Sequence, residues 1–227
     1  MRERVLGTLT IGQAPRPDVT PILDAHISPN VQRIDCGALD GLTRDEIARR
    51  YQPSAGEPVL ITRLQDGGSV ELSRRRMRDG VQQALAALED EGCDTILLLC
   101  TGTFDGLECR KAWLVEPDHL IPPLVAGLMQ RRQLGIVVPL ASQMGSESGK
   151  WHPLKQPPVF AAASPYGDET EAALAAGRDL LAHGAEAILL DCIGFTERHR
   201  EMLAPLGAPV ILSNAIVAKA LGELLGG

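Results

Sequence analysis

Two cysteines stand at equivalent places in a segment that the chain contains twice. Residues 91–102 (EGCDTILLLCTG) reappear 92 positions later as residues 183–194 (HGAEAILLDCIG). In each copy a glycine ends a helical stretch, an apolar run short enough to be a buried strand follows, and a Cys-x-Gly turn closes the segment. We therefore expect Cys100 and Cys192 to face each other across a cleft, where one thiol removes a proton and the other delivers one.

The place of each thiol at a strand end favours chemistry. Backbone N–H groups freed at the following turn or helix lower the pKa of a thiol towards the thiolate that acts as a base or nucleophile. A buried cysteine is otherwise a small apolar side chain, and that alternative stays open for the pair. We interpret Cys36, Cys93 and Cys109 as structural cysteines of this kind, because they have no repeated partner.

Small polar residues follow the first thiol. Thr101, Gly102 and Thr103 offer hydroxyls and free N–H groups, which together form a seat for a carboxylate or phosphate. The second copy has the less polar segment 193–195 there, with Gly194 in the place of Gly102. We expect one half of the protein to bind the anionic group of a ligand. The alternative is plain helix capping by threonine.

Two further loops end at the same expected cleft. After the first strand, Gln13 and Arg16 lie in a proline-rich loop, where the amide could hydrogen-bond a ligand and the guanidinium could clamp a carboxylate. The alternative is that Arg16 points into solvent while the residues after it start a helix. Ser213 and Asn214 follow the last strand and open the final helix. They are candidates for ligand contacts, and the alternative is an ordinary helix cap.

Charged residues near these loops are less specific candidates. Arg74 and Arg75 belong to a run of three arginines at a helix start, which opposes the helix dipole and favours either a bound anion or an exposed basic face. His199 follows the second thiol closely enough to polarise it. The other histidines lack metal-ligand spacing, and no glycine-rich phosphate loop is present, so we expect no metal, cofactor or nucleotide.

The elements that must position these residues alternate between strands and helices. Apolar periodicity predicts eight strands, at 5–11, 31–35, 59–63, 95–100, 134–138, 159–163, 187–192 and 210–212. It predicts helices at 43–51, 73–91, 118–132, 168–183, 196–203 and 214–225. Such alternation implies parallel strands joined by right-handed crossovers, and hence an α/β fold.

The repeat predicts two doubly wound, Rossmann-like lobes with parallel sheets related by pseudo-two-fold symmetry. We place the first lobe at 1–115 and the second at 116–207, with 208–227 returning to the first. The first half is longer, so it carries an insertion at about 35–72, which includes a tight hairpin turn at 65–68.

Composition limits the classes of function. The net charge is -7, which argues against a nucleic-acid or anionic membrane surface, and no apolar run approaches the roughly 20 residues of a membrane span. Five scattered cysteines without Cys-x-x-Cys spacing, and no signal peptide, indicate a cytoplasmic protein with free thiols. A small organic carboxylate is the expected partner, and a homo-oligomer stays open.

Several motifs resemble a known family. The two cysteine turns are similar to those of the aspartate/glutamate/hydantoin racemase superfamily, in which each of two lobes offers one cysteine. Over nearly the whole chain, the sequence more closely resembles the AroM family. The motifs that carry this likeness are LTIG (9–12), SRR (73–75), IPPLV (121–125), KQPPVF (155–160), LDCIGF (190–195) and LSN (212–214).

The superfamily resemblance implies an Asp/Glu racemase-like fold and cofactor-free proton transfer at a carbon next to a carboxylate, with Cys100 and Cys192 as the acid/base pair. It implies Thr101, Gly102, Ser213 and Asn214 as carboxylate-binding positions. The leading hypothesis is a racemase or isomerase. A single-thiol lyase or decarboxylase and a non-catalytic binding protein of the AroM type are the alternatives. Glutamate racemases often have threonine after the second cysteine, where this chain has Ile193, which argues against a free amino acid substrate.

Overall fold

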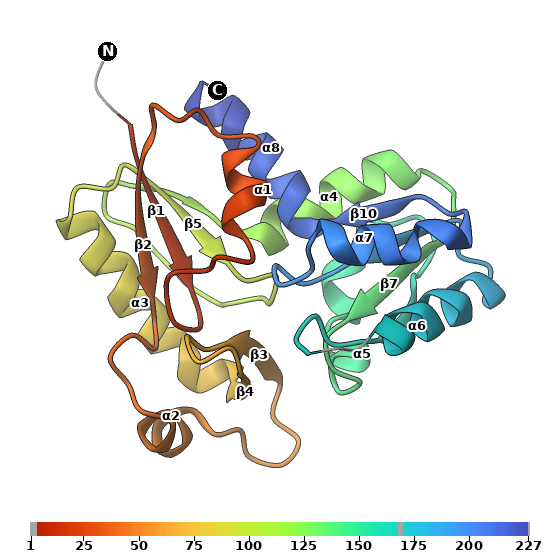
Figure 1. Cartoon of the computed structure of the whole chain (residues 1–227), viewed down its shortest axis with the longest axis horizontal. Coiled ribbons are helices and arrows are strands. Elements are labelled where there is room, and N and C mark those ends of the chain that lie inside the picture. Colours follow the sequence, from red (N-terminus) through yellow and green to blue (C-terminus); the bar gives the residue numbers. More distant parts are fainter. Residues whose placement is uncertain (1–3, 168–169, 227) are drawn as a thin grey trace.

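The chain folds into two four-stranded parallel sheets that lie side by side (Figure 1). The computed structural model describes residues 4–167 and 170–226. The first sheet has the order β2-β1-β5-β6 and the second the order β10-β9-β7-β8, so the second repeats the first when it is read as β8-β7-β9-β10. The strands are β1 (Val5–Thr10), β2 (Gln32–Gly37), β5 (Thr95–Leu99), β6 (Trp113–Val115), β7 (Leu134–Val138), β8 (Val159–Ala162), β9 (Ala187–Leu190) and β10 (Val210–Leu212). The expected pair of similar α/β lobes is therefore confirmed.

Helices cover the faces of both sheets, as parallel strands require. The longer helices are α2 (Arg44–Tyr51), α3 (Arg74–Asp90), α4 (Pro117–Met129), α6 (Thr170–Ala182), α7 (Glu197–Leu203) and α8 (Ser213–Leu225). Short helices are α1 (Thr20–Asp24), α5 (Gln143–Ser146) and the 3₁₀ turns η1 (Ser148–Trp151) and η2 (Ala204–Leu206). Within the described residues no helix combines the length and the apolar character needed to cross a membrane.

The sheet register brings the two cysteine turns to corresponding edges. Thr10 of β1 is opposite Leu99 of β5, and Val137 of β7 is opposite Leu190 of β9. All residues of β5, β7 and β9 are buried, because helices cover both faces of these central strands. Cys100 and Cys192 therefore follow strands that are fixed within a packed core.

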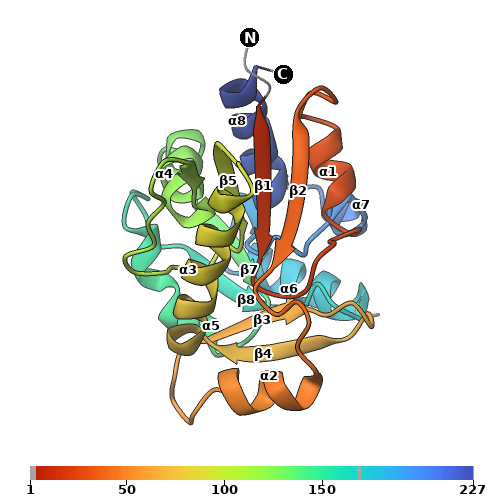
Figure 2. The same ribbon diagram turned by 90° about the vertical axis from the view of Figure 1, so that its left-hand side faces the viewer.

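The insertion in the first half is a helix followed by a hairpin. Strands β3 (Val59–Arg63) and β4 (Ser69–Ser73) pair antiparallel, and Figure 2 shows them with α2 beyond the end of the first sheet. The predicted turn at 65–68 is confirmed, since the N–H of Leu64 donates to the carbonyl of Gly68 and Gly67 has a φ of 86°. The hairpin lies at the carboxyl ends of β1 and β5, where the first cysteine turn is.

The C-terminal segment links the two halves. Strand β10 pairs with β9 in the second sheet, so the strand of residues 208–227 lies there and not in the first sheet. Helix α8 packs against α1 and α4, and a Cβ at Gly222 would overlap the carbonyl oxygen of His26. This close approach of α8 to the chain after α1 joins the lobes. The exact division into 1–115 and 116–207 stays a prediction.

All eight strands expected from periodicity are present, and the differences concern short elements. Strand β6 and the short helices α5, η1 and η2 were not predicted. These helices span only three or four residues, about one turn, which is too few to show a helical period. The expected helix at 168–183 corresponds to α6, although residues 168–169 lie outside the described residues.

Candidate active site

A small cavity lies between the two cysteine turns. Its walls come from the loop after β1, the β3 strand of the hairpin, the ends of β5, β7 and β9, and the segment between β7 and β8. Both thiols line it, together with Arg16, Thr101 and Gly102. Its volume is about 30 Å³, which is room for a water molecule or two. A larger ligand therefore requires the walls to move apart.

The two thiols have matching backbone surroundings. The N–H of Gly102 donates to Cys100 Sγ and the N–H of Gly194 donates to Cys192 Sγ, each at 3.4 Å. Burial nevertheless raises the pKa of Cys100 to about 12 and that of Cys192 to about 11. In this closed cavity both groups are neutral thiols at neutral pH, although each N–H bond favours the thiolate.

Arg16 and Tyr166 lie on the side of the second thiol. The Arg16 guanidinium is 5% exposed and makes two bonds to the Asp18 carboxylate, from Nε at 2.9 Å and from Nη2 at 2.8 Å. Burial opposes its charge most strongly, but the hydrogen bond to Asp18 and the charges of Tyr166, Asp18 and Cys192 together outweigh burial, and the pKa of Arg16 is raised. Both Arg16 and the Tyr166 hydroxyl lower the pKa of Cys192 from the value that burial alone would give.

Each Cys-x-Gly turn needs its glycine for a close approach. A Cβ at Gly102 would lie 2.6 Å from Leu60 of the hairpin, and one at Gly194 would lie 2.7 Å from the Tyr166 hydroxyl. The sequence analysis assigned both glycines to ligand binding. In the structure Gly102 lines the cavity and Gly194 is not among the lining residues, and both allow a neighbouring side chain to pack against a thiol turn.

A buried ionic network, which the sequence analysis did not find, joins the two thiol turns. Lys150 Nζ lies 2.5 Å from Asp191 Oδ2 and 3.4 Å from Glu147 Oε2, and it donates to the carbonyl oxygen of Thr101 at 3.0 Å. Glu147 also pairs with Arg74 at 3.3 Å. Burial lowers the pKa of Lys150, but the carboxylates of Asp191 and Glu147 outweigh burial and the pKa is raised.

This network has one readable signal in the sequence. Asp191 is the only charged residue in the apolar run 187–195, and a buried charge requires a partner. The partner itself is not readable. Lys150 lies in the turn η1, in a polar stretch without periodicity, and only the three-dimensional fold brings it to Asp191.

Other expected ligand contacts have roles in the framework around the cavity. Gln13 donates to the carbonyl oxygens of Leu39 and Leu42 and accepts from the N–H of Gln65, so it ties the loop after β1 to the hairpin. It is not among the residues that line the cavity. Thr103 hydrogen-bonds the Asp118 carboxylate instead.

Ser213 and Asn214 lie behind the second thiol turn. Both are buried, and neither is among the residues that line the cavity. Asn214 Nδ2 donates to the carbonyl oxygens of Ile193 and Phe195, at 2.9 and 2.5 Å, and thereby holds the turn that follows Cys192. Within the described structure this side chain positions the turn.

His199 and Arg75 also point elsewhere. The ring of His199 accepts from the N–H of Thr196 at 2.9 Å and caps α7, and burial lowers its pKa. Arg75 pairs with Glu57 at 2.9 Å. With Arg74 bound to Glu147, protein carboxylates provide the negative charge that two of the clustered arginines at the start of α3 require.

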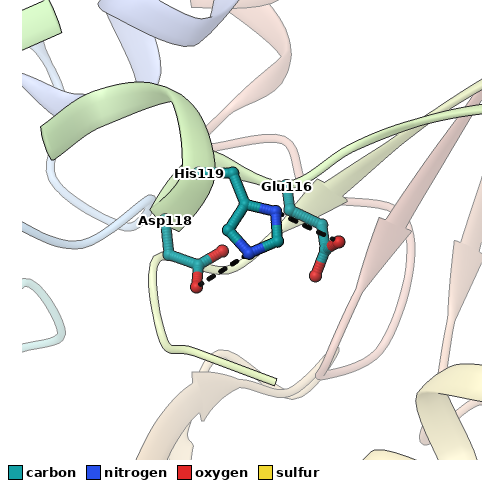
Figure 3. Close-up of side chains that lie close together, drawn as sticks. All are labelled: Glu116, Asp118 and His119. Atoms are coloured by element: carbon teal, nitrogen blue, oxygen red, sulfur yellow. Dashed lines mark ion pairs between the residues drawn. The ribbon is translucent and has the colours of Figure 1, made fainter. Parts of the chain in front are cut away.

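A separate group of polar side chains lies at the start of α4 (Figure 3). Glu116, Asp118 and His119 each offer one atom of a kind that binds metals, and these atoms lie within 4.8 Å of one another. The two ring nitrogens face the two carboxylates, Nδ1 at 3.5 Å from Glu116 and Nε2 at 3.9 Å from Asp118. Burial raises the pKa of both carboxyl groups. An imidazole between two carboxylates can form ion pairs without a metal, so this geometry does not require one.

The fold of this chain is found in known structures. A glutamate racemase from Francisella tularensis in complex with D-glutamate superposes with a TM-score of 0.66, at 14% identity, over 100% of this chain and 82% of that chain. Allantoin racemase from Klebsiella pneumoniae gives 0.64 at 14% identity, over 99% and 88%. Unliganded arylmalonate decarboxylase gives 0.58 at 13% identity, over 99% and 93%.

At these identities the likeness shows a shared fold. Among curated proteins, none matches the chain. The sequence family provides a closer relation, because the description of the AroM protein family matches residues 6–225, which include both sheets and both thiol turns. The chain is therefore a member of the AroM family with the fold of the Asp/Glu racemases.

Proposed function

We propose that this protein is a cofactor-independent racemase or isomerase of a small carboxylate, with Cys100 and Cys192 as the acid/base pair. The observation that carries the proposal is that both thiols line one cavity and each receives an N–H bond from the glycine two residues later. The two thiols are also near enough for the charge of Cys192 to raise the pKa of Cys100. This arrangement supports a reaction in which one thiol accepts a proton from a ligand and the other donates one.

The roles of the remaining cavity residues follow from their charges. Arg16 is buried beside Cys192 and has five N–H groups, of which four are bonded to Asp18, Thr10 and Tyr166. The remaining N–H group of Arg16 binds the carboxylate of a ligand and holds the ligand beside the second thiol. Arg16 also favours the thiolate of Cys192, so Cys192, after losing its own proton to solvent, removes the proton of the ligand in one direction, and the neutral thiol of Cys100 donates its proton to the opposite face.

The energetics require more than the two thiols. General acid–base catalysis contributes about 10² to 10⁴ in rate, whereas a hydrogen on carbon next to a carboxylate is very weakly acidic. Fixed donors must stabilise the charge that develops on the carboxylate. The guanidinium of Arg16 is such a donor, held in place by Asp18.

The experiment is hydrogen exchange in D₂O with a panel of small hydroxy acids, dicarboxylates, hydantoins and aryl acids, followed by NMR and mass spectrometry. The proposal predicts deuterium at the acidic carbon and interconversion of enantiomers. Cys100→Ser and Cys192→Ser should each reduce turnover by about 10² or more, and Cys109→Ser, which changes a thiol outside the cavity, should not. Full turnover in either of the first two variants contradicts the two-thiol reaction.

The same assay separates the alternatives. Loss of carbon dioxide without racemisation indicates a decarboxylase, and the fold shared with arylmalonate decarboxylase makes this the second candidate. Tight binding without exchange or loss of mass indicates a binding protein.

A further inference from the structure

Two residues that line the cavity each have a buried polar side-chain atom without a hydrogen-bond partner among the described residues. The atoms are Asp191 Oδ1, from the turn before the second thiol, and Thr62 Oγ1, from the β3 strand of the hairpin. Asp191 is 3% exposed and Thr62 is 1% exposed. A buried acceptor without a partner costs about 1–3 kcal/mol, and more when it is charged. Such atoms in a ligand cavity point to a group that the ligand supplies.

The chemistry of these atoms defines that group. A carboxylate oxygen only accepts, so Asp191 Oδ1 requires an O–H or N–H on the ligand, while a threonine hydroxyl both donates and accepts. The other oxygen of Asp191, Oδ2, lies 2.5 Å from Lys150 Nζ. A ligand donor at Oδ1 therefore meets the acceptor of an ion pair, in the residue immediately before Cys192.

The cationic side chains that line the cavity determine how many carboxylates a ligand can have. The three N–H groups of Lys150 are directed at Asp191, Glu147 and the carbonyl of Thr101, so the ammonium has none left for a ligand. Arg16 keeps one N–H group. The cavity thus offers a cationic donor to one carboxylate and an acceptor to one O–H or N–H group.

We propose that Asp191 and Thr62 bind an O–H or N–H group on the reacting carbon of the substrate, and that the substrate is a monocarboxylate of the 2-hydroxy or 2-amido type. This inference rests on the proposed function. It makes Asp191 and Thr62 specificity-determining residues. It also gives the hairpin inserted in the first lobe a role, since Thr62 belongs to that hairpin and lines the cavity together with Asp191.

The test compares two acids of equal size, lactate and isobutyrate, in which a hydroxyl replaces a methyl group. Binding by calorimetry and hydrogen exchange in D₂O are measured for each. Wild-type protein should prefer lactate by about 10-fold or more, as one charge-assisted hydrogen bond provides. Malate, which adds a second carboxylate to the same hydroxy acid, should bind no more tightly than lactate.

Asp191→Asn and Thr62→Val preserve the shape of each side chain and remove the charge or the hydroxyl. Each should reduce the preference for lactate by about 3- to 10-fold and leave binding of isobutyrate within about 3-fold. Asp179→Asn, on the exposed face of α6, is the control and should leave the preference unchanged. If Asp191→Asn does not fold, Thr62→Val still tests the assignment.

The outcomes separate the inference from the proposed function. A preference for lactate in binding that the variants reduce, without any exchange, supports the inference and contradicts the racemase. Exchange of both acids at equal rates supports the racemase and overturns the inference. The inference is also overturned if neither acid binds at millimolar concentration, if the variants keep the full preference, or if malate binds 10-fold more tightly than lactate.

Discussion

Lys150 is the residue whose removal tests the description of the site most directly. Its ammonium joins the two thiol turns, and its side chain is 9% exposed, against 6% for Glu147 and 2% for Asp191. Lys150→Met keeps most of the side-chain volume but leaves two buried carboxylates, with only Arg74 near one of them. Breaking a buried ion pair by removing one partner costs about 3–5 kcal/mol.

The expected change is large for a chain of this size. At about 2–4 °C per kcal/mol, the melting temperature of Lys150→Met should fall by about 6–20 °C at pH 7. Lys155→Met, which removes an exposed lysine five positions later, should stay within about 0.5 kcal/mol of wild type. Differential scanning calorimetry and urea unfolding measure both variants.

The dependence on pH has a definite sign. Because the pKa of Lys150 is raised by folding, its contribution is complete below the ordinary lysine pKa of about 10.4 and is lost as the pH rises through the raised value. Wild type should therefore lose stability relative to Lys150→Met above that pH. A variant within 1 kcal/mol of wild type at pH 7 would refute the buried network.

Two more predictions concern the thiol turns. The raised pKa values of Cys100 and Cys192 predict that alkylation by iodoacetamide, measured by mass spectrometry, is slow at pH 7 and still accelerates above pH 9. Ionisation of these thiols should destabilise the fold in the same pH range. An alkylation rate that levels off below pH 8 would contradict the raised values. Gly194→Ala places a methyl group 2.7–2.8 Å from the Tyr166 side chain, so unfolding should cost about 1–3 kcal/mol less than in wild type, and an unchanged urea midpoint would show that the turn is not tightly packed.

The fold was predictable from the sequence because its signals are local and repeated. Each central strand is a short apolar run between a glycine and a Cys-x-Gly turn, and the repeat at 91–102 and 183–194 implies two similar sheets. Both thiols were found in the same way. Strand β6, with three residues at a sheet edge, carries no such signal.

Much of the site was not predictable, because its side chains meet through long-range contacts. Lys150 and Tyr166 come from irregular segments of the second lobe, and Thr62 comes from a hairpin that is an insertion in the first. Some residues predicted as ligand contacts have framework contacts in the structure, and this has a physical reason. Gln13, Ser213 and Asn214 follow strand ends, but buried backbone carbonyls there also need partners, and Gln13 and Asn214 serve those carbonyls.

The two thiols have equivalent backbone surroundings and unequal side-chain surroundings, since Arg16 favours the thiolate of Cys192 and Lys150 that of Cys100. Mirror-image molecules have the same free energy, so in the proposed reaction this inequality cannot enrich one enantiomer. The unequal surroundings instead change the free-energy barriers of the two proton transfers, one at each thiol. Kinetic isotope effects measured from opposite enantiomers should therefore differ in size, even though the final mixture contains both in equal amounts.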